Sequence, residues 1–116
     1  MAFDGSCHCG AVTFTVDAAM PETAISCNCS ICRRKGSLLS FFPASVFTLK
    51  SGEDQLKGYT FHIHRIEHLF CTECGMHPFA KATGPDGVDT RAINMRCVPD
   101  CDLEGLAVHN YDGASK

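Results

Sequence analysis

The sequence predicts a mainly β fold in a single domain that spans residues 1–116, and three observations support this prediction. Short runs rich in β-branched and aromatic residues recur along the chain, and turn signals built from Gly, Pro, Asp and Ser separate them. A chain of 116 residues has the length of one ordinary domain. Nine cysteines in close groups indicate that bound metal reinforces the modest core of so short a chain.

The first half of the chain is expected to contain several short strands and one helical turn. Residues 11–17 alternate, with Val12, Phe14 and Val16 on one face, as a half-buried strand does. After a break at 20–22, we expect a strand over 24–27 and a helical turn over 30–35 that ends at Gly36. A strand over 37–42, a turn at 43–45 and an extended segment over 46–49 follow.

The second half continues the β pattern. A strong turn signal at 51–54 precedes two expected strands, over 56–63 and 65–70, which are rich in aromatic residues, isoleucine and histidine. A second turn at 84–87 leads into an expected strand over 88–97, which ends at 98–100. Residues 103–108 fit either a short helix or a short strand. Many short strands joined by turns are typical of a mainly β domain.

The composition excludes several classes of protein. A hydrophobic fraction of 45% and a mean hydropathy of −0.01 indicate a soluble globular protein, because disordered chains are less apolar. No run approaches the ~20 apolar residues of a membrane span. A net charge of −3 argues against a nucleic-acid partner, which requires a basic face. No export leader precedes the first cysteine, so we expect a cytoplasmic protein in which the cysteines bind metal rather than form disulfides.

Cys27, Cys29 and Cys32 are the first candidate metal ligands. In an extended C-x-C segment the two side chains point to the same side, and the following C-x-x-C turn brings the third sulfur to them. Three thiolates leave one tetrahedral position of a zinc ion open, which distinguishes a reactive zinc from a structural one. The cations at 33–35 would offset the negative charge of such a site. Alternatively, the three cysteines are buried thiols that bind no metal. The alternative for the cations at 33–35 is a solvated surface run with no role at the site.

A second group of ligands is formed by two pairs far apart in the sequence. Cys71 and Cys74 form a C-x-x-C-G knuckle, in which Gly75 supplies the positive φ that lets backbone N–H groups reach the sulfurs. A closed site needs two more ligands, and the C-x-C-G pair Cys7 and Cys9 supplies them. The competing arrangement combines Cys7 and Cys9 with two of the three cysteines at 27–32, which leaves the knuckle short of ligands.

The remaining candidates are two cysteines and several histidines. Cys97 is expected to be a buried thiol in a strand, and Cys101 follows a turn; either of them can complete the second zinc as a fourth ligand, which would make that site inert. His62 and His64 share one face if their segment is a strand, and they are pocket-lining or metal-binding candidates. His77 lies three residues after the knuckle.

Four segments carry a family resemblance: G-S-C-H-C-G at 5–10, C-N-C-S-I-C-R-R-K-G at 27–36, F-C-T-E-C-G at 70–75 and N-M-R-C at 94–97. Their order and spacing resemble the glutathione-dependent formaldehyde-activating enzyme family, which includes the centromere protein V relatives. The resemblance implies a zinc-bound fold of small packed antiparallel sheets with two Zn²⁺ per chain. It implies a closed structural zinc at Cys7, Cys9, Cys71 and Cys74, and an open zinc at Cys27, Cys29 and Cys32. The family's aromatic-Asp-Gly motif is present at 111–113, without the Trp that follows it in relatives.

The resemblance also implies a carbon–sulfur lyase or synthase, of the S-(hydroxymethyl)glutathione synthase type, that joins a small thiol such as glutathione to an aldehyde such as formaldehyde. The substrate thiol would take the open zinc position, where it loses its proton near neutral pH. Arg33, His62 and His64 are the candidates to supply a proton or a positive charge to the developing alkoxide. The alternative function is a non-catalytic, zinc-stabilised binding or interaction module. A nucleic-acid-binding zinc ribbon is disfavoured by the acidic charge balance.

Overall fold

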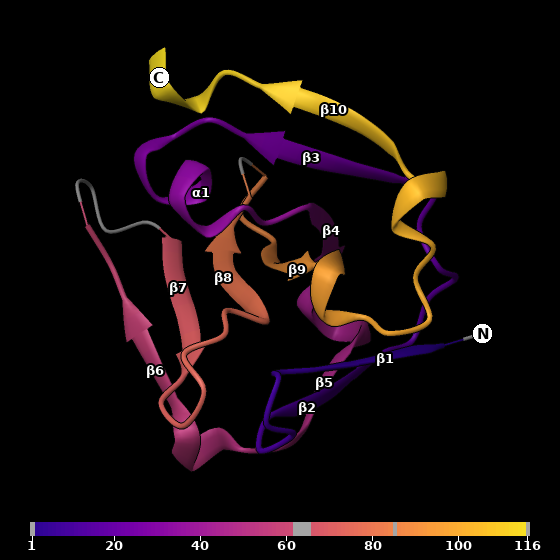
Figure 1. Ribbon diagram of the computed structural model, residues 1–116, viewed down its shortest axis with the longest axis vertical. Coiled ribbons are helices and arrows are strands. Elements are labelled where there is room, and N and C mark those ends of the chain that lie inside the picture. The colour runs from indigo at the N-terminus through magenta and orange to yellow at the C-terminus, as the bar shows by residue number, and fades with distance from the viewer. Residues whose placement is uncertain (1, 62–65, 85, 116) are drawn as a thin grey trace.

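Two β-sheets make up most of the protein (Figure 1). The structure, a computed structural model, describes residues 2–61, 66–84 and 86–115. One sheet has three strands in the order β1-β2-β5, and the other has seven in the order β10-β3-β4-β9-β8-β7-β6. Neighbouring strands pair antiparallel except β10 and β3, which run parallel. The prediction of a mainly β fold built from antiparallel sheets is therefore confirmed, with one parallel pair added.

The strands are short, as the spacing of turn signals predicted. The three-stranded sheet consists of β1 (Phe3–Ser6), β2 (Thr13–Val16) and β5 (Phe47–Ser51). The seven-stranded sheet consists of β3 (Thr23–Cys27), β4 (Leu39–Pro43), β6 (Leu56–Tyr59), β7 (Ile66–Cys71), β8 (Phe79–Thr83), β9 (Asp89–Asn94) and β10 (Ala107–Tyr111). Single 3₁₀ turns cover Ala44–Val46, Glu53–Gln55, Met95–Cys97, Leu103–Gly105 and Gly113–Ser115.

The one α-helix of the described residues, α1 (Ser30–Lys35), matches the helical turn expected from the sequence. Cys29 caps its start, and the Cys29 sulfur accepts a hydrogen bond from the backbone N–H of Cys32. Gly36 caps its end; it has φ 72° and donates its N–H to the carbonyl of Cys32. A glycine in the left-handed conformation is the usual end of a helix because it has no Cβ to strain. Among the described residues, no helix combines the length and apolarity needed to cross a bilayer.

The main core lies between the two sheets. Val12, Phe14 and Val16 are fully buried, which confirms the alternation expected for residues 11–17. Phe14 and Val16 pack with the inward-facing residues of the larger sheet, which include Leu69, Phe79 and Ile93. Aromatic rings hold this interface together: Phe14 stacks on Phe47 at a centroid distance of 5.4 Å, and Phe47 lies 4.7 Å from Phe79.

The other face of the seven-stranded sheet packs against α1. Ala80 and Ala92 pair across β8 and β9 and form a small cluster with Leu39 and Cys32. Because side chains alternate along each strand, these residues lie on the face opposite Phe79 and Ile93. The larger sheet therefore separates a side that packs on the three-stranded sheet from a side that packs on the helix with its cysteines.

Several expected boundaries were wrong. The strand expected over 88–97 ends at Asn94, because the Asn94 side chain accepts a hydrogen bond from the N–H of Arg96 and caps a 3₁₀ turn; Cys97 therefore lies in that turn, not in a strand. The segment 103–108 is partly a 3₁₀ turn and partly the start of β10. Strands β1 and β8 were not expected. Of the strand expected over 56–63, residues 56–59 form β6, and residues 62–65 lie outside the described residues.

Candidate metal centres

The sulfurs of Cys7, Cys9, Cys71 and Cys74 form the first cluster, and all lie within 4.8 Å of one another. The sulfur–sulfur distances are 3.6 Å between Cys7 and Cys9 and 3.7 Å between Cys9 and Cys71. A tetrahedral zinc with Zn–S bonds of about 2.3 Å places its sulfurs about 3.8 Å apart. The four thiols are therefore spaced as ligands of one tetrahedral ion are. We call this group the closed cluster.

Two glycine turns position the sulfurs of the closed cluster. Gly10 follows Cys9 with φ 82°, and Gly75 follows Cys74 with φ 77°, so both adopt the left-handed conformation that the knuckle requires. No atom lies within 4 Å of the place a Cβ would take at either glycine, so backbone conformation rather than space selects the residue. The loop after β1 and the loop after β7 thereby meet, and residues 62 positions apart in the sequence come into contact.

The acidity of the closed cluster also suits a cation. Backbone N–H groups of Cys9 and Met76 lower the pKa of Cys74 to about 6. The N–H of Ala11 lowers the pKa of Cys9, but desolvation and its hydrogen bonds to the other three thiols outweigh this and raise that pKa to about 12. The thiols share protons, so the group does not become a set of four thiolates unaided. A bound divalent cation would stabilise the fully deprotonated set.

Cys27, Cys29 and Cys32 form the second cluster, with their sulfurs within 4.8 Å of one another. We call it the open cluster. Cys27 ends β3, Cys29 caps α1 and Cys32 lies in its first turn. The N–H of Cys29 donates to the sulfur of Cys27 at 3.4 Å, and the N–H of Cys32 donates to the sulfur of Cys29 at 3.5 Å. The strand-to-helix turn thus aims three sulfurs at one point, and no further described residue joins this group.

Protonation within the open cluster is shared as well. Burial acts to raise the pKa of Cys29. The N–H of Cys32 and hydrogen bonds with the neighbouring thiols outweigh burial, so the pKa of Cys29 lies below its ordinary value. Burial, followed by the hydrogen bond and the charge of Cys29, raises the pKa of Cys32 to about 12. Without a bound cation, a thiolate at Cys29 therefore disfavours deprotonation of Cys32. All nine cysteines are free thiols, so both clusters can hold a metal ion.

Lys35 is a partly buried cation on the side of α1 that faces the sheet. Its Nζ lies 3.4 Å from Nδ1 of His68, a buried residue of β7. Burial lowers the pKa of Lys35, while the negative charges of Cys32 and Cys29 act to raise it. Burial, and then the charge of Lys35, lowers the pKa of His68 to about 4, so its imidazole is neutral at pH 7. A neutral Nδ1 that accepts a hydrogen bond from the Lys35 ammonium fits both groups.

The neighbourhood of Lys35 contains two further groups named in the sequence analysis. His77 is half-buried, with its ring 5.4 Å from that of Phe70, and burial followed by Lys35 lowers its pKa. Nδ1 of His77 is buried and has no hydrogen-bond partner among the described residues. Cys97 is buried, as expected, and burial is the largest cause that raises its pKa to about 11. Its thiol approaches the carbonyl of His77 at 3.8 Å.

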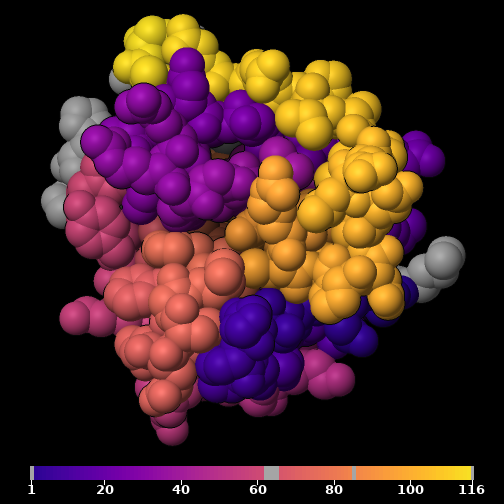
Figure 2. All heavy atoms as spheres, viewed as in Figure 1, coloured from indigo at the N-terminus to yellow at the C-terminus, as the bar shows by residue number. Residues whose placement is uncertain are grey.

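The C-terminal residues 110–115 pack beside the open cluster (Figure 2), and we call them the C-terminal strap. Asn28 anchors the strap: its amide donates to the Asp112 carboxylate at 3.0 Å, and its side-chain oxygen accepts from the N–H of Ala114 at 2.9 Å. The backbone N–H of Asn28 donates to the carbonyl of Tyr111. A Cβ on Gly113 would lie 2.5 Å from the sulfur of Cys27, so the strap approaches the cluster closely only because this residue is glycine.

The other predicted site residues are placed as follows. The structure brings Cys7 and Cys9 together with Cys71 and Cys74, not with the cysteines at 27–32 as in the competing arrangement. Cys97 and the half-buried Cys101 belong to neither cluster. Arg33 is exposed on α1. His62 and His64 lie outside the described residues. Sequence reasoning missed the inward position of Lys35, although its spacing of three residues from Cys32 places it on the same face of the helix.

Comparisons with known proteins show what this chain is similar to. The family model of the glutathione-dependent formaldehyde-activating enzyme matches residues 2–102. A Halomonas elongata protein named as a putative glutathione-dependent formaldehyde-activating enzyme is 30% identical over an alignment of 107 residues, and the match covers 74% of this chain and 68% of that protein. A crystal structure of a Rhodobacter sphaeroides protein superimposes with a TM-score of 0.76 at 25% identity, and the match covers 91% of this chain and 99% of that one.

Proposed function

The chain belongs to the glutathione-dependent formaldehyde-activating enzyme family, and from this premise we propose that it is a zinc-dependent carbon–sulfur lyase. In this proposal it joins a small thiol to an aldehyde and, in reverse, cleaves the product. Glutathione and formaldehyde are the substrates that the family's description suggests. We place the reaction in the cytoplasm, where thiols are kept reduced.

The observation that carries the proposal is the three-sulfur geometry of the open cluster. Four thiolates close a zinc site, whereas three leave one position for an exchangeable ligand. We propose one structural zinc at the closed cluster and one reactive zinc at the open cluster, held by Cys27, Cys29 and Cys32. When bound there, zinc would lower the pKa of a substrate thiol, which is ordinarily about 8.5, toward neutrality.

The protein's own groups have a separate task, which concerns the aldehyde oxygen. The reaction forms one carbon–sulfur bond: the thiolate sulfur attacks the carbonyl carbon, the π electrons move to oxygen, and the oxygen takes up a proton. We propose that Lys35 stabilises the developing alkoxide and donates this proton. Its ammonium group is held by His68, and as a partly buried cation it acts more strongly than one in water.

Arg33 has a weaker role in this proposal. It is exposed, so water and salt screen its charge, and it contributes a positive potential at the surface rather than a direct contact. His62 and His64, which lie outside the described residues, remain candidates to supply a proton or a positive charge to the alkoxide. A substrate would approach beside the C-terminal strap, whose Gly113 lies next to Cys27.

The experiment that tests the function measures exchange rather than product. Thiols add to formaldehyde without a catalyst, so we use ¹³C-formaldehyde and glutathione at equilibrium and measure the exchange rate of the adduct by NMR. The zinc-loaded protein should raise this rate in proportion to its concentration. Cys29→Ser should abolish the increase and keep one zinc per chain, because Cys29 is in the open cluster. Cys101→Ser is the matched control and should keep both the activity and two zinc ions.

A second measurement separates an enzyme from a binding module. Co²⁺ replaces zinc, and its d–d absorption is followed while glutathione is added. If the thiol reaches the open cluster, the absorption of one Co²⁺ changes and that of the other does not, and Cys29→Ser removes the change. An exchange rate equal to that of glutathione alone, with both Co²⁺ spectra unchanged, would show that the chain is a zinc-stabilised module without this activity.

A further inference from the structure

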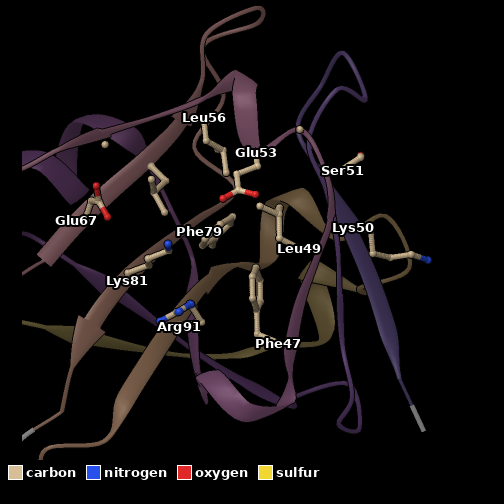
Figure 3. A pocket seen from close by; sticks show the side chains of 13 residues that line it. Phe47, Leu49, Lys50, Ser51, Glu53, Leu56, Glu67, Phe79, Lys81 and Arg91 are labelled. Atoms are coloured by element: carbon tan, nitrogen blue, oxygen red, sulfur yellow. The ribbon is translucent and has the colours of Figure 1, made fainter.

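A second ligand-sized site lies on the face of the seven-stranded sheet opposite the open cluster. It is a pocket of about 550 Å³ between β5 and the inner side of β6, β7, β8 and β9 (Figure 3). Glu67, Lys81 and Arg91 are cross-strand neighbours on this face. The residues that alternate with them, His68, Ala80 and Ala92, point to the side where α1 packs. The sheet itself therefore separates the pocket from the open cluster, and the carbon–sulfur chemistry proposed above does not use it.

The floor of the pocket is apolar. Phe47 and Phe79 lie with ring centroids 4.7 Å apart, and Leu49, Leu56 and Leu69 complete the lining. These side chains belong to the main core or pack against it, so the floor is held in place by the fold. A volume of about 550 Å³ is within the range of small-molecule sites, which combine such an apolar surface with a few polar groups.

The rim carries charges of both signs that are not paired with each other. Glu53 and Glu67 contribute two carboxylates, and Lys81 and Arg91 contribute two cations. No ion pair joins these four side chains in the part of the chain that the structure describes, although Glu67 and Lys81 are directly opposite on adjacent strands. Figure 3 shows the carboxylate of Glu53 over the floor, and Lys81 and Arg91 on the opposite side. Lys50, also at the rim, points away.

Arg91 is the most fixed of these groups. Its guanidinium carbon lies 5.9 Å from the ring centroid of Phe47, a cation–π distance, and its Nη1 donates to the carbonyl of Thr90 at 3.3 Å. Its Nε is buried and has no hydrogen-bond partner among the described residues. A buried donor without a partner is costly, so the protein alone does not fully satisfy the Arg91 guanidinium.

The position of the Glu67 carboxylate depends on Gly58, which has no side chain. Its carboxylate lies over Gly58 of β6, in the space that a Cβ at position 58 would occupy. This position keeps the carboxylate on the pocket side of the sheet and apart from Lys81. The two carboxylates and the two cations balance, so the pocket suits a ligand of zero net charge that carries both signs.

We propose that this pocket binds a small zwitterion of the amino-acid type that has an apolar side chain. Arg91 and Lys81 take the carboxylate, Arg91 through donors that are free to pair with it. Glu53 takes the ammonium group, Glu67 offsets the charge of Lys81 from the adjacent strand, and the apolar side chain lies on Phe47 and Phe79. Charge-assisted hydrogen bonds at both ends, rather than the apolar contact alone, give the site its selectivity.

The test uses a zwitterion and two analogues that each lack one of its charges. L-phenylalanine carries both charges, 3-phenylpropionate lacks the ammonium group, and phenethylamine lacks the carboxylate. Each is titrated into the ¹⁵N-labelled, zinc-loaded protein, and the amide shifts are followed. L-phenylalanine should give saturable shifts in β5, β8 and β9. Each of the other probes should bind at least about tenfold more weakly, since it loses a charge-assisted contact.

Variants assign the binding to the named side chains. Arg91→Gln and Glu53→Gln should each weaken L-phenylalanine binding at least about tenfold, by the same loss of one contact. Lys50→Gln removes a rim cation that points away and should leave the affinity unchanged. Three equal affinities, shifts confined to residues near the open cluster, or no saturable shift would each overturn the proposal. None of these outcomes depends on whether the chain exchanges formaldehyde.

Discussion

Three consecutive cations on α1 have different surroundings, and helix geometry explains why. Successive residues point about 100° apart around a helix, whereas residues three apart share a face. Cys32 is buried against the sheet, so Lys35 also turns toward it, while Arg33 and Arg34 turn to solvent. Arg34 bonds back to the carbonyl of Ser30 at 2.7 Å and supports the helix. A run of like charges can thus contain one functional candidate and two surface residues.

This difference gives a prediction for Lys35→Gln. The substitution removes the cation that contacts His68 and leaves the cysteines unchanged. We expect kcat/KM for adduct exchange to fall about tenfold to a hundredfold, because a positioned charge or proton donor is lost. The zinc content and the melting temperature should stay near those of the parent protein. Exchange NMR and metal analysis check both.

The matched control is Arg33→Gln, which removes one positive charge from the exposed side of the same helix. It should change the rate little and only at low salt, because exposed charges are screened. Lys35→Arg keeps the charge and should recover part of the activity. Equal effects of Lys35→Gln and Arg33→Gln would contradict the role given to Lys35, since net charge alone would then explain the result.

Gly75 provides a second prediction at this scale. It has φ 77° and open space around it, so Gly75→Ala costs only backbone strain. We expect the free energy of unfolding to fall by about 1–2 kcal/mol, the cost of a left-handed conformation for an L-residue. Gly75→Asn should cost less, because asparagine tolerates this region. Chemical denaturation at saturating zinc measures both, and equal losses would point to side-chain size instead of φ.

At the scale of elements, the C-terminal strap depends on one side chain. Both polar groups of the Asn28 amide bond to residues of the strap. Asn28→Ala should therefore release the strap and raise amide hydrogen exchange over residues 110–115. Exchange in β7 and β8 should not change, because those strands pair with each other and not with the strap. Unchanged protection of residues 112–115, which lie beyond the pairing of β10 with β3, would contradict the anchoring role of Asn28.

The strap should also respond to acid. Hydrogen bonds from Ser115 and Asn28 lower the pKa of the Asp112 carboxylate below its ordinary value of 3.8. A lowered folded pKa means that these bonds contribute fully above the ordinary value and are lost as pH falls through the lowered one. Amide exchange of Ala114 should thus increase only in that acidic interval. In Asn28→Ala, NMR titration of the Asp112 carboxylate should show a higher pKa, and an unchanged midpoint would contradict the contribution of Asn28.

Elements with strong local signals could be predicted from the sequence. The helix α1 matches its expected range because Gly36 ends it, and residues 13–16 alternate plainly. Strand β8 could not be predicted because alanine and lysine fill its centre, and both are uncommon in strands. Strand β1 contains Asp4 and Gly5, which are also depleted there. Their positions depend on pairing with distant strands, which local sequence does not encode.

Part of the candidate site could be predicted from the sequence, and part could not. Spacing alone grouped the seven cysteines of the two clusters, because ligand geometry limits how close pairs can combine. The strap and the pair formed by Lys35 and His68 require residues brought together from separate elements, so they appear only in the folded chain. The charged pocket is a further example, since its walls come from five strands.

For the whole molecule, the two clusters predict different effects of metal loss. The closed cluster joins the three-stranded sheet to the β7–β8 loop, whereas the open cluster lies within one short segment. Cys71→Ser should therefore lower the melting temperature strongly and leave one zinc per chain. Cys32→Ser should also leave one zinc, with a much smaller loss of stability. Metal analysis and calorimetry test this, and the reverse order of stabilities would contradict the structural role of the closed cluster.

The spacing of the ligands also sets an order of events at the ribosome. The open cluster is complete as soon as residue 32 has left the exit tunnel, so a nascent chain can take up its first ion early. The closed cluster needs Cys74, so the thiols of Cys7 and Cys9 must wait until the chain has been made as far as residue 74. During translation those thiols are exposed to oxidants and to competing ions, so under the proposed zinc occupancy timely delivery of zinc would matter most for the closed cluster.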